Sequence, residues 1–76
     1  MPWRERIESD PGILGGKPVI RGTRLSVEYV IDLLSQGWSA DDVVRHHRNV
    51  TVEDVFACLA YALAILQERQ ARAMPA

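Results

Sequence analysis

Residues 39–55 read SADDVVRHHRNVTVEDV, and this stretch decides the fold because it carries the start signals of two helices. Ser39–Asp42 and Thr51–Asp54 both match a capping box, in which a hydroxyl and a later acid satisfy each other's backbone N–H groups. Asn49 lies between them and tolerates the left-handed conformation that ends a helix. The sequence therefore predicts a short helix, a long helix and a tail, over 39–48, 51–72 and 73–76.

A further helix is expected upstream, over 26–37. Ser26 can cap its start, and Gly37 can close its end from the left-handed region. Its apolar stripe consists of Val27, Val30, Ile31 and Leu34. Helices joined by loops this short must pack together, and the last two have the outline of a helix-turn-helix. We expect one domain over 1–76, mainly α, with three helices in a helix-turn-helix-like arrangement.

A basic β-arm over 6–25 is expected to precede the helices. Its centre, GGKPVIRGTR (15–24), concentrates glycine, proline and cations. Ile13-Leu14 and Val19-Ile20 are short apolar pieces separated by a glycine-rich turn, which predicts a hairpin. Ile7 could begin a short edge strand before them.

Composition bounds the class of protein. The 76 residues are 47% hydrophobic and 25% charged, with net charge −1, which is typical of one small globular domain without a strong overall field. The single cysteine, Cys58, excludes an intrachain disulfide framework and fits a reducing compartment. The N-terminus lacks a secretory signal, and the longest apolar run, 55–66, is shorter than the roughly twenty residues of a membrane span. We therefore expect a soluble cytoplasmic protein with no membrane association.

The apolar run VFACLAYALAIL (55–66) is hydrophobic nearly all the way round. One stripe at helical spacing would be buried in the protomer: Val52, Val55, Phe56, Leu59, Leu63 and Leu66. Alanines account for part of the remaining surface through helix propensity alone. Alternatively, a second copy covers a second face, and we favour this homodimer. Its expected interface residues are Val55, Leu59, Tyr61, Ala62, Ile65 and Leu66.

The arm carries three cations and no carboxylate between Pro11 and Val27. They could simply keep an edge hairpin soluble. They could also contact DNA, with further phosphate contacts from the second helix. The candidate DNA-binding residues are Lys17, Arg21, Arg24, Arg45 and Arg48. The acids Glu53 and Asp54 argue against the long helix itself reading the major groove.

No enzyme site, metal site or cofactor site is predicted. The glycines do not match a phosphate-binding loop, because Pro18 follows the only lysine. His46 and His47 are about 100° apart on a helix and cannot grip one metal together. Cys58 lies within the apolar run and is expected to be an inert core thiol.

The segments GGKPVIRGTR, LSQGWSADDV and TVEDV resemble motifs of the bacterial family called domain of unknown function 433. The resemblance covers roughly residues 7–66. It implies a helix-turn-helix-like fold and a predicted role as the antitoxin of a toxin–antitoxin pair. The partner it implies is a PIN-like ribonuclease toxin.

Arg69 and Arg72, near the end of the long helix, are candidate toxin-binding residues. A nuclease of this kind holds its metal in a ring of carboxylates, with which an arginine could pair bidentately. Alternatively, these cations only favour the helix dipole at a solvated end. Two other functions also stay open: a stand-alone DNA-binding regulator, and a dimeric interaction module without DNA binding.

Overall fold

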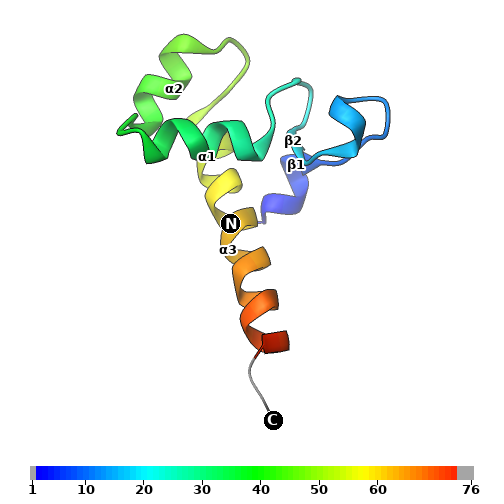
Figure 1. Ribbon diagram of the computed structural model, residues 1–76. Helices are drawn as coiled ribbons and strands as arrows, with labels where there is room; N and C mark the ends of the chain where they lie inside the picture. Colours follow the sequence, from blue (N-terminus) through cyan, green and yellow to red (C-terminus); the bar gives the residue numbers. More distant parts are fainter. Residues whose placement is uncertain (1, 74–76) are drawn as a thin grey trace.

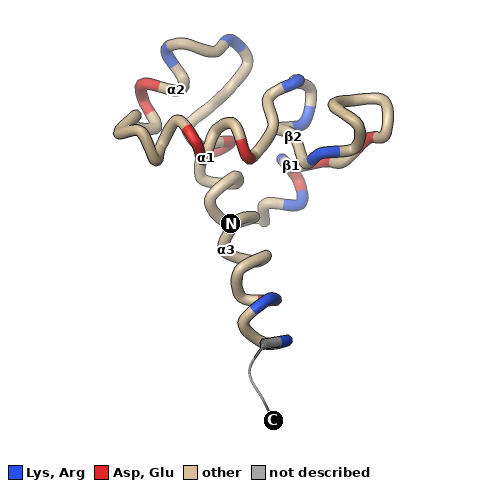
Figure 2. The backbone as a smooth tube through the Cα atoms, in the orientation of Figure 1, with Lys and Arg blue, Asp and Glu red and all other residues tan. Residues whose placement is uncertain are grey.

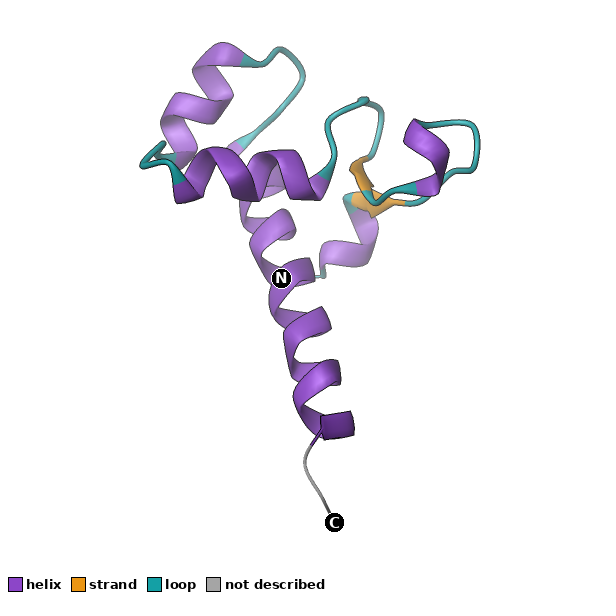
Figure 3. Ribbon diagram, viewed as in Figure 1, coloured by secondary structure: helices purple, strands orange, loops and turns teal. Residues whose placement is uncertain are grey.

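Three α-helices and a two-stranded antiparallel sheet form the fold (Figures 1 and 3). The computed structural model describes residues 2–73. The helices are α1 (Val27–Ser35), α2 (Ala40–His46) and α3 (Val52–Ala73), and the strands are β1 (Ile7–Glu8) and β2 (Val19–Ile20). Two 3-10 turns, Trp3–Glu5 and Leu14–Gly16, flank β1 and precede β2. The predicted class, mainly α with a small N-terminal β element, is confirmed.

Both predicted capping boxes form. The Asp42 N–H donates to Ser39 Oγ at 3.1 Å, and the Ser39 N–H donates to Asp42 Oδ2 at 2.9 Å. The Asp54 N–H donates to Thr51 Oγ1 at 3.1 Å, and the Thr51 N–H donates to Asp54 Oδ2 at 2.9 Å. These reciprocal bonds satisfy backbone donors that α2 and α3 would otherwise leave unpaired.

The remaining start and stop signals also act as expected. Ser26 Oγ accepts the Tyr29 N–H at 3.0 Å and so caps α1. Gly37, with φ 100°, follows the end of α1, and Asn49, with φ 67°, lies in the turn between α2 and α3. Both residues occupy the left-handed region that ends helices, and glycine and asparagine adopt it at low cost.

The sheet pairs different strands from those expected. Ile7 lies opposite Ile20 and Glu8 lies opposite Val19, whereas Ile13 and Leu14 belong to no strand. The predicted hairpin between Ile13-Leu14 and Val19-Ile20 is therefore wrong. Its backbone explains why: three consecutive residues have positive φ, namely Leu14 (49°), Gly15 (66°) and Gly16 (89°). A run of residues with positive φ turns the chain and cannot adopt the extended backbone of a strand. Leu14 therefore cannot continue a strand, and β2 pairs with the earlier Ile7 strand.

The core draws on all three helices and both strands. Its buried apolar side chains are Ile7, Val19, Ile20, Val27, Val30, Leu33, Val43, Val50, Val55, Ala57 and Cys58. Fully burying one Val, Leu or Ile side chain contributes roughly 1.5–3 kcal/mol. We call residues 2–58, which contain this core, the head.

Beyond the head, α3 continues as a projecting helix whose far end no other element within residues 2–73 covers (Figure 1). We call residues 59–73 the projecting half of α3. The projection makes the molecule elongated, with extents of 45 × 30 × 21 Å. No helix within residues 2–73 is both long enough and apolar enough to cross a membrane.

The stripe predicted to be buried faces mostly outward. Its members Phe56, Leu59, Leu63 and Leu66 are 49%, 43%, 54% and 56% exposed. The core face of α3 instead carries Val55 and the small side chains Ala57 and Cys58, all 0% exposed. Both faces have apolar residues at helical spacing, so periodicity alone could not show which face is buried and which is exposed. Because small side chains permit close approach, the small-residue face packs against the head.

Candidate functional site

An exposed apolar stripe runs along α3. We call Phe56, Leu59, Leu63 and Leu66 the outer stripe. Their spacing of three, four and three residues is that of a coiled-coil seam, in which such positions meet a partner helix. A contiguous apolar strip that stays exposed marks an interaction surface more than chance exposure does.

A groove of about 710 Å³ lies between α3 and the start of α1. Its lining residues are Lys17, Pro18, Ser26, Val27, Glu28, Ile31, Tyr61, Ala62, Ile65, Leu66 and Arg69. Tyr61 is held by an edge-to-face contact with Trp3, with ring centroids 4.9 Å apart. The groove therefore has a rigid aromatic side chain in its wall and a mainly apolar lining.

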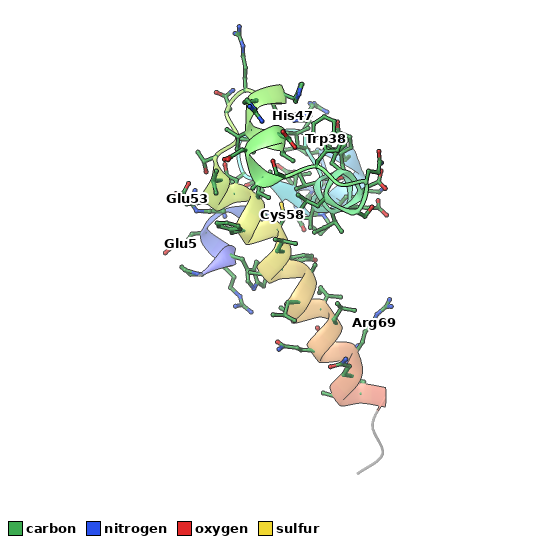
Figure 4. The ribbon with its side chains drawn as sticks, turned by 90° about the vertical axis from the view of Figure 1, so that its left-hand side faces the viewer. Glu5, Trp38, His47, Glu53, Cys58 and Arg69 are labelled. Carbon is green, nitrogen blue, oxygen red and sulfur yellow. The ribbon has the colours of Figure 1, made fainter. Side chains whose placement is uncertain are left out.

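Charged side chains form the rim of the groove. Lys17 Nζ lies 3.4 Å from Glu28 Oε1, and both side chains are largely exposed. Arg69 adds a second cation from the projecting half of α3. It leaves α3 on the side over which the head extends, opposite Glu5 and Glu53 (Figure 4). Two cations and one carboxylate give the rim a net positive charge.

The six residues predicted for a dimer interface fall into three groups. Leu59 and Leu66 lie on the outer stripe, and Tyr61, Ala62 and Ile65 line the groove together with Leu66. Val55 is fully buried in the core of its own chain, so the prediction that it contacts a partner is wrong. It lies within the part of α3 that the head covers.

The five predicted DNA-binding cations are all exposed, but the structure pairs three of them with carboxylates of the same chain. Lys17 pairs with Glu28, and Arg45 Nη2 lies 2.7 Å from Asp42 Oδ1. Arg24 and Arg48 form no ion pair within the described residues. Most basic positions lie on the head, and two more lie near the end of α3 (Figure 2). Internal pairing reduces the positive field available to a phosphate.

Arg21 has mainly a structural role in the arm. Its Nη1 lies 3.2 Å from Glu8 Oε1 on the neighbouring strand. Its Nε and Nη2 donate to the backbone carbonyls of Glu5 and Arg4 at 3.1 and 3.3 Å. The guanidinium therefore joins the end of β2 to the 3-10 turn that precedes β1.

The start of α3 is tied to the N-terminal segment by a residue that sequence reasoning missed. Arg6 Nη1 lies 3.1 Å from Asp54 Oδ1, and Asp54 is only 8% exposed. The same carboxylate caps α3, so one acid both stabilises the helix start and binds Arg6. The two residues are 48 positions apart, and no local pattern indicates their contact.

The pKa of Asp42 lies below its usual value. The main cause is the hydrogen bond from the Ser39 backbone N–H, followed by hydrogen bonding with the Ser39 side chain and Arg45. The carboxylate is therefore held in its charged form at the start of α2, where the helix dipole also favours a negative charge.

Each histidine contacts neighbouring groups of its own chain. His47 Nδ1 lies 3.0 Å from the Val43 carbonyl and Nε2 lies 3.1 Å from the Tyr29 hydroxyl. The ring of His46 contacts Trp38 edge-on at 5.0 Å. Within residues 2–73, no group of three or more His, Cys, Asp or Glu side chains could hold a metal ion.

Cys58 is the buried thiol that the sequence indicated. Burial raises its pKa to about 12, with a further contribution from the nearby Asp54 charge. A thiol that stays protonated and inaccessible is a poor nucleophile and a poor metal ligand.

Comparison with known proteins places this geometry in a family. The family described as "Protein of unknown function (DUF433)" matches residues 7–62. The "Uncharacterized protein y4eO" of Sinorhizobium fredii (strain NBRC 101917 / NGR234) is 36% identical over 61 residues, which are 80% of this chain and 28% of that protein. The crystal structure of a DUF433 member protein from Anabaena variabilis superposes with a TM-score of 0.76 at 25% identity, covering 88% of this chain and 66% of that one.

Proposed function

The chain belongs to the DUF433 family, and we propose that it is the antitoxin of a type II toxin–antitoxin pair, which binds and neutralises a PIN-like ribonuclease toxin. The family match covers residues 7–62, and the family's description names no activity. The antitoxin role is what the motif resemblance implies, and it requires a surface that binds protein.

The outer stripe is the observation that supports a protein-binding role, because it provides the dimer on which the proposal builds. Phe56, Leu59, Leu63 and Leu66 are all more than 40% exposed on one helix. Covering one half-exposed leucine contributes about 1 kcal/mol at the usual value per area of apolar surface. A strip of four such side chains therefore supports stable association. We propose that a second copy of the chain covers it, because the coiled-coil spacing suits an identical helix.

The end of α3 supplies charge for a toxin. Arg69 lies on the groove rim, and Arg72 pairs with Glu68 one turn earlier. A PIN-like nuclease presents metal-binding carboxylates, and a guanidinium pairs with such groups through two parallel hydrogen bonds. We propose that Arg69 makes the main contact and that Arg72 must first leave Glu68.

Co-expression with the nuclease encoded by the neighbouring open reading frame tests the proposal. The chain should relieve the growth arrest that the nuclease causes, and Arg69→Glu should weaken the relief. Arg24→Glu is the matched control, since it makes the same charge change on a loop of the head and should leave relief intact. Growth arrest that the unmodified chain does not relieve would contradict the antitoxin role.

A second function, binding of operator DNA with repression of the chain's own operon, is favoured by Arg24 and Arg48. These cations are exposed, form no ion pair within residues 2–73, and would be doubled in a dimer. Binding to promoter DNA should weaken with salt, and each substitution to Ala should reduce the slope by about one if that cation contacts a phosphate. A stand-alone regulator would retard DNA without any nuclease partner, whereas a pure interaction module would retard none.

A further inference from the structure

The groove and the outer stripe share Leu66 at their common edge, and their remaining residues face different directions. On a helix, successive residues are about 100° apart, so Leu63 on the stripe and Ile65 in the groove are separated by about 200°. A helix that covers the stripe therefore leaves most of the groove open. The groove needs an occupant of its own, apart from the second copy placed on the stripe.

We propose that the groove binds an amphipathic helix of the partner protein, with its apolar side on Ile31, Tyr61 and Ile65 and a carboxylate at the Lys17–Arg69 rim. This inference rests on the proposed function, because it assigns the site through which the chain would hold its partner. It identifies that partner segment by chemistry: apolar residues along one face and acids along its flank.

The walls favour a helix over an extended peptide. An extended peptide gains affinity by pairing its backbone with a free strand edge. Pro18 has no N–H, and its carbonyl already accepts the Val27 N–H at 2.9 Å. The Lys17 N–H already donates to the Leu14 carbonyl at 3.4 Å, so these backbone groups are not available to pair with a peptide. A helix satisfies its own backbone and needs only an apolar surface.

The dimensions of the groove suit a short helix. Its α3 wall runs from Tyr61 to Arg69, which is about 12 Å of helix at the usual rise per residue. A helix laid along this wall would place two turns of anchoring side chains in the groove, at the i, i+3, i+4 and i+7 spacing of helix-in-groove complexes. The volume of about 710 Å³ is within the range of ligand-binding clefts.

The rim charge favours an acidic occupant. Lys17 and Arg69 outnumber Glu28, and the long, exposed Lys17–Glu28 pair at 3.4 Å can exchange Glu28 for an incoming carboxylate. Exposed ion pairs contribute little stability, so this exchange costs little. The end of a second copy's α3 is a poor occupant, because Arg69 and Arg72 outnumber Glu68 there and would meet the positive rim. A nucleic acid suits the cations but not the apolar wall.

Two synthetic amphipathic peptides test the proposal. Both are about 15 residues long, the length at which isolated helices begin to form, with leucines at the four anchor positions. One has glutamates and the other lysines at the flanking positions. Titrated into the full chain and followed by NMR, the glutamate peptide should shift resonances of Ile31, Tyr61 and Ile65. Its dissociation constant should be at least about tenfold lower than that of the lysine peptide.

Three variants localise the binding. Ala62→Arg fills the groove and should abolish binding, and Arg69→Glu should reverse the preference between the peptides. Leu63→Asp, on the outer stripe, is the matched control and should leave both affinities unchanged. Circular dichroism of each variant shows whether it remains folded. If Ala62→Arg unfolds the chain, Arg69→Glu still tests the proposal, because Arg69 lies on an exposed turn of α3 where a substitution should not disturb the fold.

Several results would overturn the proposal. Equal affinity for both peptides, shifts confined to the outer stripe, or no binding would each do so. Concentration-dependent shifts of Ile31, Tyr61 and Ile65 without peptide would assign the groove to a second copy, and shifts of the same residues on adding duplex DNA would assign it to nucleic acid. Since no nuclease is present, these outcomes are independent of co-expression: peptide binding without relief of growth arrest would remove the antitoxin role and leave the groove site standing.

Discussion

The two halves of α3 have similar apolar composition and different surroundings. In the first half, Val55, Ala57 and Cys58 are completely buried in the core of the head, while Phe56 on the opposite side stays exposed. In the projecting half, Leu63, Ile65 and Leu66 are all exposed. Hydrophobicity alone therefore does not say whether a helix residue stabilises its own fold or meets another molecule. What decides it is whether other elements of the same chain reach that part of the helix.

The largest expected difference between the halves is in thiol reactivity. Iodoacetamide should modify Cys58 at least about a thousandfold more slowly than the unfolded chain, because reaction requires opening of the core. A Cys58→Ala, Ala71→Cys variant moves the thiol to the exposed end of α3 and should react at nearly the unfolded rate. Rapid modification of native Cys58 would show that the first half of α3 is loosely packed.

The pH dependence of stability follows from the same thiol. The pKa of Cys58 is raised from 9.0 to about 12, so the unfolded chain loses its proton at lower pH than the native chain. The stabilisation from the neutral buried thiol is complete below pH 9.0 and is lost as pH rises from there toward about 12. Cys58→Ala should flatten this alkaline decline in denaturant-unfolding experiments.

Truncation of one side chain in each half should separate core from interface. Val55→Ala should lower the free energy of unfolding by about 2–3 kcal/mol at every protein concentration, through lost burial and a cavity. Leu63→Ala should lower it only at concentrations where a second copy is bound, since binding stabilises the folded state by mass action. Equal losses for both at all concentrations would contradict the division of α3.

A smaller effect is expected where α3 enters the head. Asp54→Ala removes the carboxylate of the α3 capping box and the partner of Arg6, and should cost about 1–2 kcal/mol. Glu53→Ala, at the exposed neighbouring position, should stay within about 0.5 kcal/mol of the unmodified chain. Arg6→Ala should reproduce part of the loss of stability caused by Asp54→Ala. If neither substitution lowers the free energy of unfolding, the Arg6–Asp54 contact does not stabilise the fold.

The smallest effect is expected at the contact between α1 and the end of α2. The Val43 carbonyl can only accept, so in the neutral imidazole the contact assigns the proton to His47 Nδ1 and leaves Nε2 to accept from the Tyr29 hydroxyl. Tyr29→Phe should cost about 0.5 kcal/mol, because the partly exposed hydroxyl exchanges this bond with water. Nitrogen NMR of His47 should show the Nδ1–H tautomer, and the opposite tautomer would contradict the assigned bonds.

Local signals were the part of the fold that the sequence predicted well. Ser39–Asp42 and Thr51–Asp54 form their capping boxes, and Gly37 and Asn49 have positive φ where helices end. Each of these features depends only on residues a few positions apart, so the local sequence pattern includes all the groups that form it. Burial of Cys58 was predictable for a similar reason, because it lies within a long apolar run.

Contacts between distant segments were the part that failed or was missed. The Ile7 strand pairs with β2 across a loop whose residues 14–16 all have positive φ, which composition alone did not specify. The Arg6–Asp54 pair joins the N-terminal segment to α3 without any local pattern. In α3, two faces fit the same periodicity, and only the position of the head selects Ala57 and Cys58 as the inner one. The groove was missed because it forms only where α1 overhangs the projecting half of α3.

The central claim is that a second copy of this chain covers the outer stripe. Sedimentation equilibrium of the unmodified chain and of Leu59→Asp and Leu63→Asp variants at micromolar concentration tests it most directly. The unmodified chain should have the mass of a dimer, and both variants should be folded monomers by circular dichroism, because an aspartate in the seam places an unpaired charge in an apolar contact. A folded monomer for the unmodified chain, or a dimer that both aspartates leave intact, would contradict the account.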